Sequence, residues 1–328
     1  MIDILFNLLG RMFGFGKKET PLGEPEVEGD IDPLDELDSD GTRKMPLWMV
    51  IIMFPFLLIG LVLKPFEWVL QILFAPLEML LPKSWRGDDG LLGTIKTVAY
   101  AILIAMVIRT VAYEPFNIPS GSMKPTLLVG DYLFVSKFAY GYSNYALGFG
   151  TDLDLFEGRL FSAEPERGDV VVFRKPTDTS IDFIKRVVGL PGDTVQMLDG
   201  VLHINGTSVK LEEALPFLDQ SCTDARPTDQ YIETLPNGVS HEVLDHSDSN
   251  RYDNTEPETV PPGHYFMMGD NRDSSNDSRT PGVSFVPLEN LIGRADILFF
   301  STNGCGGLFY PWTWPSSIRW DRLFQPVE

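Results

Sequence analysis

The chain of 328 residues is long enough to bury a domain-sized core and still supply membrane segments and linkers. Its formal net charge of −20 argues against nucleic acid as a partner, because phosphate binding requires a basic surface. The two cysteines, Cys222 and Cys305, are too few for a disulfide scaffold and lack the close spacing of a zinc site. They form one bridge if their domain is exported and are ordinary thiols if it is not.

The first 44 residues contain two different segments. Residues 1–16 place apolar side chains at helical spacing, which predicts an amphipathic helix on a membrane surface or against a neighbour, because the stretch is too short to span a bilayer. No basic leader or small-residue cleavage site supports a signal peptide. Residues 17–44 are acidic, contain Pro and Gly and have few apolar residues, so we expect a disordered linker there.

Residues 45–89 form an apolar membrane block. A single straight helix over Pro46 to Leu81 would be about 54 Å long, against a hydrocarbon core of about 30 Å. Either Leu47 to Leu63 spans the bilayer and an interfacial helix follows, or the block is a hairpin that turns at Lys64 and Pro65. The flanking basic residues are balanced and barely discriminate, and we prefer the hairpin slightly, because it puts both basic pairs inside.

Residues 90–113 give the clearest transmembrane helix. The segment has no charged residue between Thr97 and Ile108. Lys96 and Arg109 lie near its ends, where long basic side chains can reach the interface. A buried helix of a soluble protein is the weaker alternative, since a second long apolar block precedes this one.

Residues 114–328 are predicted to form an antiparallel β-rich domain, with loop-rich insertions at 140–166 and 211–262. Short β-branched or aromatic runs bounded by Gly, Pro and Asp predict the strands: Tyr132–Phe138, Asp169–Phe173, Ile181–Val188, Thr194–Leu198, Val201–Ile204 and Tyr265–Met268. Asp199 and Gly200 separate two of these runs, which is a strong hairpin signal. No helical pattern alternates with the strands, so a parallel α/β sheet is not expected.

Lys185 lies within one of these predicted strands. The period-two pattern puts it on the same face as Ile181, Phe183 and Val187, among apolar side chains. Burial that lowered the pKa of a lysine from about 10.4 to about 8 would correspond to about 3.3 kcal/mol and would make the amine available as a general base. The plainer interpretation is a lysine whose stem packs while its ammonium reaches water or an acid.

Several blocks, taken in order, resemble the type I signal peptidases. The blocks are Pro119–Thr126 (PSGSMKPT), Gly130–Asp131, Arg167–Val170 (RGDV), Lys185–Asp193 (KRVVGLPGD) and Gly269–Arg279 (GDNRDSSNDSR). Any single block is modest evidence, since Pro-Ser-Gly-Ser is also ordinary turn chemistry. The ordered set behind a membrane segment is much more specific. The resemblance implies a membrane-anchored, mainly β fold.

The resemblance also implies roles for individual residues. Ser122 corresponds to the nucleophile and Lys185 to the general base of a Ser-Lys dyad. The Ser122 N–H and the Ser120 hydroxyl correspond to the oxyanion donors, and Ser275 to the group that orients the lysine. Four residues correspond to a charged framework around the site: Asp270, Arg272, Asp277 and Arg279. Six correspond to the lining of the shallow substrate pockets: Phe116, Ile118, Met123, Leu127, Phe183 and Ile184.

The implied function is removal of N-terminal signal peptides from exported preproteins, after small residues at Ala-x-Ala sites. The implied location is the bacterial inner membrane, with the catalytic domain on the outer, periplasmic side. The expected partners are the preproteins and the lipid bilayer; neither a metal nor a cofactor is expected. The four histidines, including His241 and His246, lie in no recognisable nucleophile–base motif and are interpreted as structural or exposed.

Two other functions remain open from the sequence. One is a processing peptidase dedicated to a single transfer or pilus system, which activity on many preproteins would exclude. The other is a catalytically silent, membrane-anchored β scaffold that binds exported chains, which unchanged processing after Ser122→Ala would favour.

Overall fold

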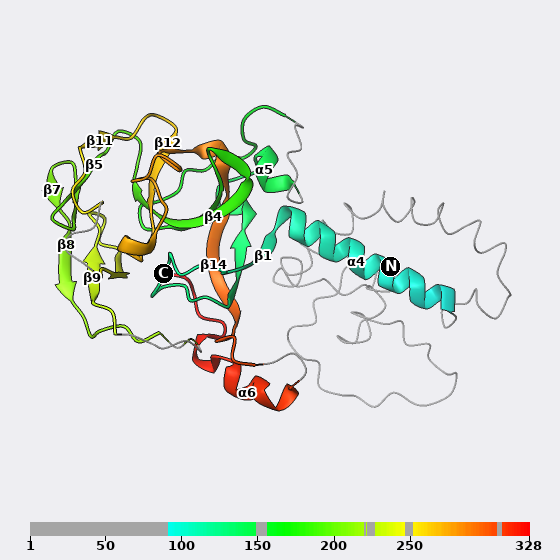
Figure 1. Cartoon of the computed structure of the whole chain (residues 1–328). Coiled ribbons are helices and arrows are strands. Elements are labelled where there is room, and N and C mark those ends of the chain that lie inside the picture. The colour runs from blue at the N-terminus through cyan, green and yellow to red at the C-terminus, as the bar shows by residue number, and fades with distance from the viewer. Residues whose placement is uncertain (1–90, 149–155, 220, 222–226, 247–251, 307–309) are drawn as a thin grey trace, which may run out of the picture. The chain divides into compact units, whose positions relative to one another are not determined.

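The computed structural model describes residues 91–148, 156–219, 221, 227–246, 252–306 and 310–328 (Figure 1). The amphipathic helix expected over 1–16, the acidic linker over 17–44 and the apolar block over 45–89 lie outside these residues. The chain divides into two units, Met1–Ile104 and Ala105–Glu328, and the second contains all the β-sheet described below.

The first described element is helix α4, Leu91–Val111. Its segment Gly93–Val111, 19 residues with a mean hydropathy of 1.7, is long and apolar enough to cross a membrane, judged by length and composition alone. The hydroxyls of Thr97 and Thr110 donate to the carbonyls of Gly93 and Met106, four residues back, at 3.0 and 2.8 Å. These two hydroxyls therefore find acceptors within the helix itself.

The main sheet has seven strands in the order β1-β2-β14-β3-β4-β12-β13, and its strand pairs are antiparallel. This confirms the antiparallel β prediction. In chain order its strands are β1 (Tyr113–Asn117), β2 (Asp131–Ser136), β3 (Val170–Lys175), β4 (Asp178–Gly189), β12 (His264–Met268), β13 (Val286–Pro287) and β14 (Leu291–Ser301).

Strand β14 is central to this sheet, between β2 and β3, yet the sequence pattern did not predict it. Its alternation is interrupted by two register shifts against β2, so that a simple period of two does not describe which side chains are buried. Gly293 lets the two strands approach, because a Cβ there would lie 2.3 Å from the carbonyl oxygen of Ser136.

A second sheet has four strands in the order β11-β5-β6-β7. These strands are β5 (Thr194–Leu198), β6 (Val201–Ile204), β7 (Thr207–Ser208) and β11 (Glu258–Thr259). The predicted hairpin is present: Leu198 pairs with Val201, and the turn residues Asp199 and Gly200 have φ values of 50° and 76°. Two consecutive positive φ values are what a two-residue hairpin turn requires.

The insertion over 211–262, which is expected to be loop-rich, also contains regular structure. A third sheet, in the order β10-β9-β8, is built from β8 (Lys210–Glu213), β9 (Gln230–Thr234) and β10 (Ser240–Leu244). Acidic residues obscured β8 and β10, because their charged side chains occupy the exposed positions of these short strands. The insertion over 140–166 contains the short helix α5 (Asn144–Leu147), and a second short helix, α6 (Trp314–Ser317), follows β14.

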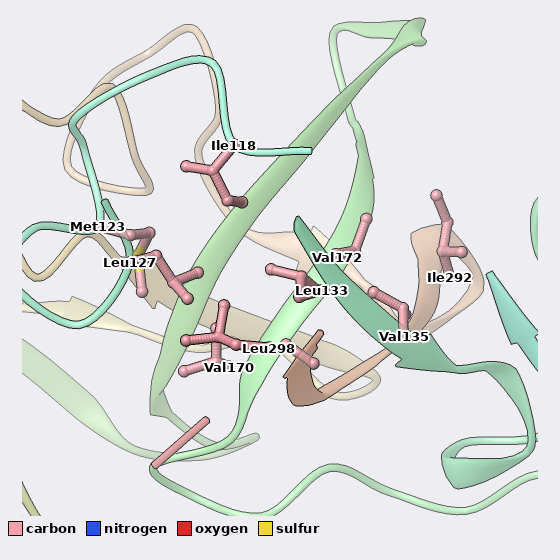
Figure 2. Packing of buried hydrophobic residues seen from close by; sticks show 10 residues of the cluster. Ile118, Met123, Leu127, Leu133, Val135, Val170, Val172, Ile292 and Leu298 are labelled. Atoms are coloured by element: carbon pink, nitrogen blue, oxygen red, sulfur yellow. The ribbon is translucent and has the colours of Figure 1, made fainter. Parts of the chain in front are cut away.

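An apolar cluster fixes the connection between β1 and β2 on the main sheet. Figure 2 shows Ile118, Met123 and Leu127 from this connection directed toward side chains of the sheet, among them Leu133 and Val170. Met123 and Leu127 have no exposed surface. Burial of such side chains stabilises a fold by about 1.5–3 kcal/mol each, so this connection is part of the core rather than a free loop. Ser122 lies next to Met123 in it.

Candidate active site

The backbone around Ser122 is held from the loop that follows β12. Asn271 donates from its backbone N–H to the Ser122 carbonyl at 3.1 Å, and from its side chain to the Gly121 carbonyl at 3.0 Å. Gly269 lies against the same backbone: a Cβ there would come 2.5 Å from the Ser122 carbonyl oxygen and 2.2 Å from Ser275 Oγ. Only glycine permits this approach.

Lys185, from β4, reaches Ser122. Its Nζ lies 2.8 Å from Ser122 Oγ and 2.7 Å from the carbonyl oxygen of Ile184. It also lies 5.3 Å from the centroid of the Phe183 ring. Both side chains of the Ser122–Lys185 pair belong to buried residues.

Burial lowers the pKa of Lys185 to about 8, against the opposing effect of the carboxylates of Asp277 and Asp270. At neutral pH about a tenth of such amines are deprotonated, compared with about one in 2,500 for an ordinary lysine. The apolar face that the alternation pattern predicted therefore gives this lysine the acid–base property that a general base needs.

The two other serines assigned to the site differ in their surroundings. Ser120 is exposed, and its Oγ lies 3.5 Å from Ser122 Oγ. Ser275 is buried close to Gly269, and its hydroxyl acts on the Asp277 carboxylate, whose pKa it helps to lower, rather than on Lys185. The orienting hydrogen bond from Ser275 to Lys185 that the resemblance implied is therefore not formed in this structure.

The pair Asp277–Arg279 lies beside the site. Arg279 donates from Nε and Nη2 to the two carboxylate oxygens of Asp277 at 2.9 and 2.8 Å, and Asp277 also accepts from the Gly269 N–H at 3.0 Å. Although burial raises the pKa of Asp277, the charge of Arg279 outweighs it and the pKa is lowered. Asp277 thus stays ionised and ties Arg279 to the glycine that contacts Ser122.

Asp270 and Arg272 have different partners and are not paired with each other, which refines the expectation that they hold one loop together. Asp270 accepts from Arg186 Nε and Nη2 at 2.9 and 2.8 Å, and from the Thr126 hydroxyl at 2.6 Å. Arg272 donates to Glu233 of β9 at 2.6 Å. The loop is therefore attached both to the β4 strand and to the sheet of the insertion.

Sequence reasoning missed several residues of this framework, namely Arg186, Glu233, Asn271 and Thr126. Arg186 and Asn271 are direct neighbours of assigned residues, so their place within the quoted blocks was the available signal. No such signal was available for Glu233, because it lies in a segment interpreted as loop.

His241 of β10 is also buried, and its Nε2 lies 3.4 Å from Oε1 of Glu233. Burial lowers the pKa of His241 to about 4, so its side chain is neutral near pH 7.

The six residues assigned to the substrate pockets do not form one lining. Met123 and Leu127 are completely buried and Ile118 nearly so, which places them in the apolar core next to the site, with almost no exposed surface in this structure. Phe116 and Ile184 pack on the same cluster and keep exposed surface. Phe183 packs on a different cluster, because successive residues of a strand face opposite sides.

Within the described ranges no three His, Cys, Asp or Glu side chains gather as a metal site would require. The arrangement provides instead a buried hydroxyl, an amine of lowered pKa next to it, and a rigid charged framework. These are the parts of a nucleophile–base pair.

Comparison with known proteins shows which family the chain resembles. Residues 91–300 match the family model described as signal peptidase, peptidase S26. A signal peptidase I of Rickettsia canadensis is 42% identical over 247 residues, which are 70% of this chain and 91% of that protein. A signal peptidase I of Rickettsia prowazekii is 43% identical over 244 residues, which are 69% and 90% of the two chains.

A crystal structure of a signal peptidase I from Enterococcus faecalis shares 27% identity, covers 40% of this chain and 97% of that one, and gives a TM-score of 0.23. The family match and the Rickettsia relatives define the class as serine peptidases. The chain belongs to the signal peptidase family.

Proposed function

We propose that the chain is a membrane-anchored peptidase that removes N-terminal signal peptides from exported preproteins, with Ser122 as nucleophile and Lys185 as general base. One observation carries this proposal: the Lys185 amine, with a pKa of about 8, lies 2.8 Å from Ser122 Oγ. A serine is a weak nucleophile without an adjacent base, and this amine provides one.

The reaction begins when neutral Lys185 accepts the Ser122 proton as Oγ forms a bond to the scissile carbonyl carbon. The tetrahedral intermediate collapses as the carbon–nitrogen bond breaks, and the Lys185 ammonium donates its proton to the leaving amine. The signal peptide is then an ester of Ser122. Water attacks this ester and gives a proton to Lys185, which returns it to Ser122 Oγ as the ester bond breaks. The signal peptide leaves as a carboxylic acid and becomes a carboxylate by losing the second proton of the water to solvent.

The oxyanion of the intermediate lies where the Ser122 N–H and the Ser120 hydroxyl can donate to it. Asn271 supports this role, since it fixes both carbonyls that flank the Ser122 N–H. Loss of one such donor typically costs about 3 kcal/mol of transition-state stabilisation. The Ser120 hydroxyl is exposed, so it can turn toward the substrate without breaking a buried hydrogen bond.

Selection of small residues before the cleaved bond is assigned to Phe116, Ile184 and Phe183, the three pocket candidates that retain exposed surface. Ile118, Met123 and Leu127 support Phe116 and Ile184 from behind. A well-packed core of this kind deforms little, so a larger substrate side chain would overlap with it and is excluded.

Helix α4 is proposed to span the bacterial inner membrane, with the β domain on the periplasmic side. Three observations support this topology. The helix has the length and composition of a span, and it ends at Val111, only eleven positions before Ser122 in the sequence. In addition, Cys305 is disulfide-bonded, which favours an oxidising compartment; Cys222, the other cysteine of the sequence, lies outside the described residues.

The test is cleavage of a preprotein with an Ala-x-Ala site by the full-length enzyme in detergent or vesicles. Ser122→Ala and Lys185→Ala should each lower kcat by at least about a thousandfold, because the remaining groups cannot replace nucleophile or base. Lys210→Ala and Ser180→Ala are matched controls at exposed positions and should cleave normally. Retained activity in either variant of the pair would contradict the assignment. Cleavage of several unrelated preproteins would exclude a peptidase dedicated to one substrate.

A further inference from the structure

Lys124 lies over the turn that carries the candidate oxyanion donors. Its side chain covers Gly121: a Cβ built on Gly121 would lie 3.1 Å from Lys124 Cε and 3.4 Å from its Nζ. Its backbone N–H closes the same turn by donating to the Gly121 carbonyl at 3.2 Å. Gly121 separates Ser120 from Ser122, so the Lys124 side chain packs against the residue between the two proposed donors.

The ammonium of Lys124 is held by Asp219, which is 95 residues away in the sequence and belongs to the insertion over 211–262. Both side chains are about one-fifth exposed, at 20% and 19%, so the pair is largely shielded from water. The second carboxylate oxygen of Asp219 accepts from the Ser221 N–H at 3.2 Å. Although burial raises the pKa of Asp219, the hydrogen bond and charge of Lys124 outweigh it and lower the pKa, which keeps the carboxylate ionised.

We infer that Lys124 and Asp219 are positioning residues for the cleavage reaction: through this ion pair the insertion holds the Gly121 turn, and with it both oxyanion donors, in the reactive geometry. This inference rests on the proposed function. Glycine is the residue with the greatest backbone freedom, so a turn centred on Gly121 needs external support. Asn271 supplies it at the Gly121 carbonyl, and Lys124 supplies it at the Gly121 α-carbon.

The effect of the pair should appear in the chemical step. Oxyanion donors act mainly in the transition state, and a displacement of about 1 Å can cost about a hundredfold in rate. The base is affected differently, because burial, Asp277 and Asp270 are the influences that set the pKa of Lys185. Loss of the ion pair should therefore lower kcat and leave the pH at which activity rises unchanged.

The experiment measures kcat, KM and the pH profile of the full-length enzyme on an Ala-x-Ala preprotein. Asp219→Asn and Lys124→Met preserve side-chain volume, and each should lower kcat by about tenfold to a hundredfold with KM changed by less than about twofold. The double variant should be no worse than either single one, because both remove the same pair. Lys124→Arg, which keeps the stem and the charge, should recover most of the rate. Glu212→Gln breaks the exposed Lys210–Glu212 pair of the same insertion and is the control expected to leave kcat unchanged.

A coupling measurement separates positioning from a general structural role. In a Ser120→Ala background the further loss from Asp219→Asn should be reduced to less than about threefold, because one of the donors that the pair positions is already gone. An unchanged kcat in Asp219→Asn overturns the inference. The inference is also overturned if Asp219→Asn lowers kcat equally in the wild-type and Ser120→Ala backgrounds and at the same time lowers the melting temperature of the protein. If Ser122→Ala retains activity, the proposed function fails first; if Ser122→Ala is inactive and Asp219→Asn is normal, only the positioning role fails.

Discussion

Two adjacent cations on strand β4 have opposite environments. Lys185 contacts oxygen atoms that carry no formal charge, those of the Ser122 hydroxyl and the Ile184 carbonyl. Arg186 is completely buried and makes a two-pronged ion pair with Asp270, with a further bond at 2.8 Å to the carbonyl of Gly168. Both residues are buried to a similar extent, so the charge of the contacting group determines whether each side chain stays charged. The lysine can lose its proton, whereas the arginine keeps its charge and joins strand to loop.

Lys185 and Arg186 therefore have different roles, although they are neighbours on one strand. A buried charge without an ionised partner is unfavourable, and at Lys185 this unfavourable energy lowers the pKa and serves the chemistry. A buried charge with a complete set of partners is costly to disrupt, and at Arg186 it keeps the loop from Gly269 to Arg279 in place. Substitutions that treat the two residues alike should therefore change stability in opposite directions.

The largest stability effect is expected for Arg186→Met. This substitution leaves the Asp270 carboxylate buried without its counter-charge, so the free energy of unfolding should fall by about 3–5 kcal/mol. Denaturant unfolding of the isolated enzyme in detergent measures it. Arg294→Met is the matched control, because its ion pair with Asp296 is half exposed and is worth less than about 1 kcal/mol. An equal decrease of the free energy of unfolding in the two variants would show that the buried ion pair contributes no more stability than the exposed one.

A smaller effect of opposite sign is expected for Lys185→Met. The pKa of Lys185 is lowered to about 8 in the folded protein, so below that pH folding must bury a charged amine. Removing it should raise the free energy of unfolding by up to about 3 kcal/mol at pH 7 while abolishing cleavage. A destabilised Lys185→Met protein would contradict the account of this lysine.

The pH dependence of that gain follows from proton binding. Between about pH 8 and the ordinary lysine pKa of about 10.4, the unfolded chain binds the Lys185 proton and the folded protein does not. Wild-type stability should therefore increase with pH across this interval relative to Lys185→Met, and the advantage of the variant should shrink toward zero above it. Parallel unfolding curves of both proteins at pH 7 and pH 10 measure the difference.

The sequence predicted much of the fold because several strands have a simple pattern. β5 and β6 match the predicted bounds, and β4 carries Lys185 with Phe183 and Val187, although Ile181 of the same predicted face is exposed. β14 could not be found in this way, since its register shifts break the period of two. The strands β8 and β10 were hidden by exposed acidic side chains, which resemble those of a solvated loop, whereas the acidic residue of β9, Glu233, is buried.

The candidate site was less predictable than the strands. The pairing of Asp270 with Arg186 and of Arg272 with Glu233 depends on tertiary contacts, because the partners come from distant segments. The sequence also did not indicate how far Met123 and Leu127 are buried, and both have no exposed surface in the structure. A local pattern shows that a residue is apolar, but only the packed structure shows how much of its surface remains open.

The measurement that tests the central claim most directly is the pH dependence of kcat/KM for the wild-type enzyme on an Ala-x-Ala preprotein. This ratio reports the ionisation of groups in the free enzyme, and cleavage requires the neutral Lys185 amine. We expect kcat/KM to rise about tenfold per pH unit below a midpoint near the Lys185 pKa of about 8 and to level off above it. A midpoint near 6.5, the ordinary pKa of histidine, or a rate independent of pH between about 6 and 9 would contradict Lys185 as the base.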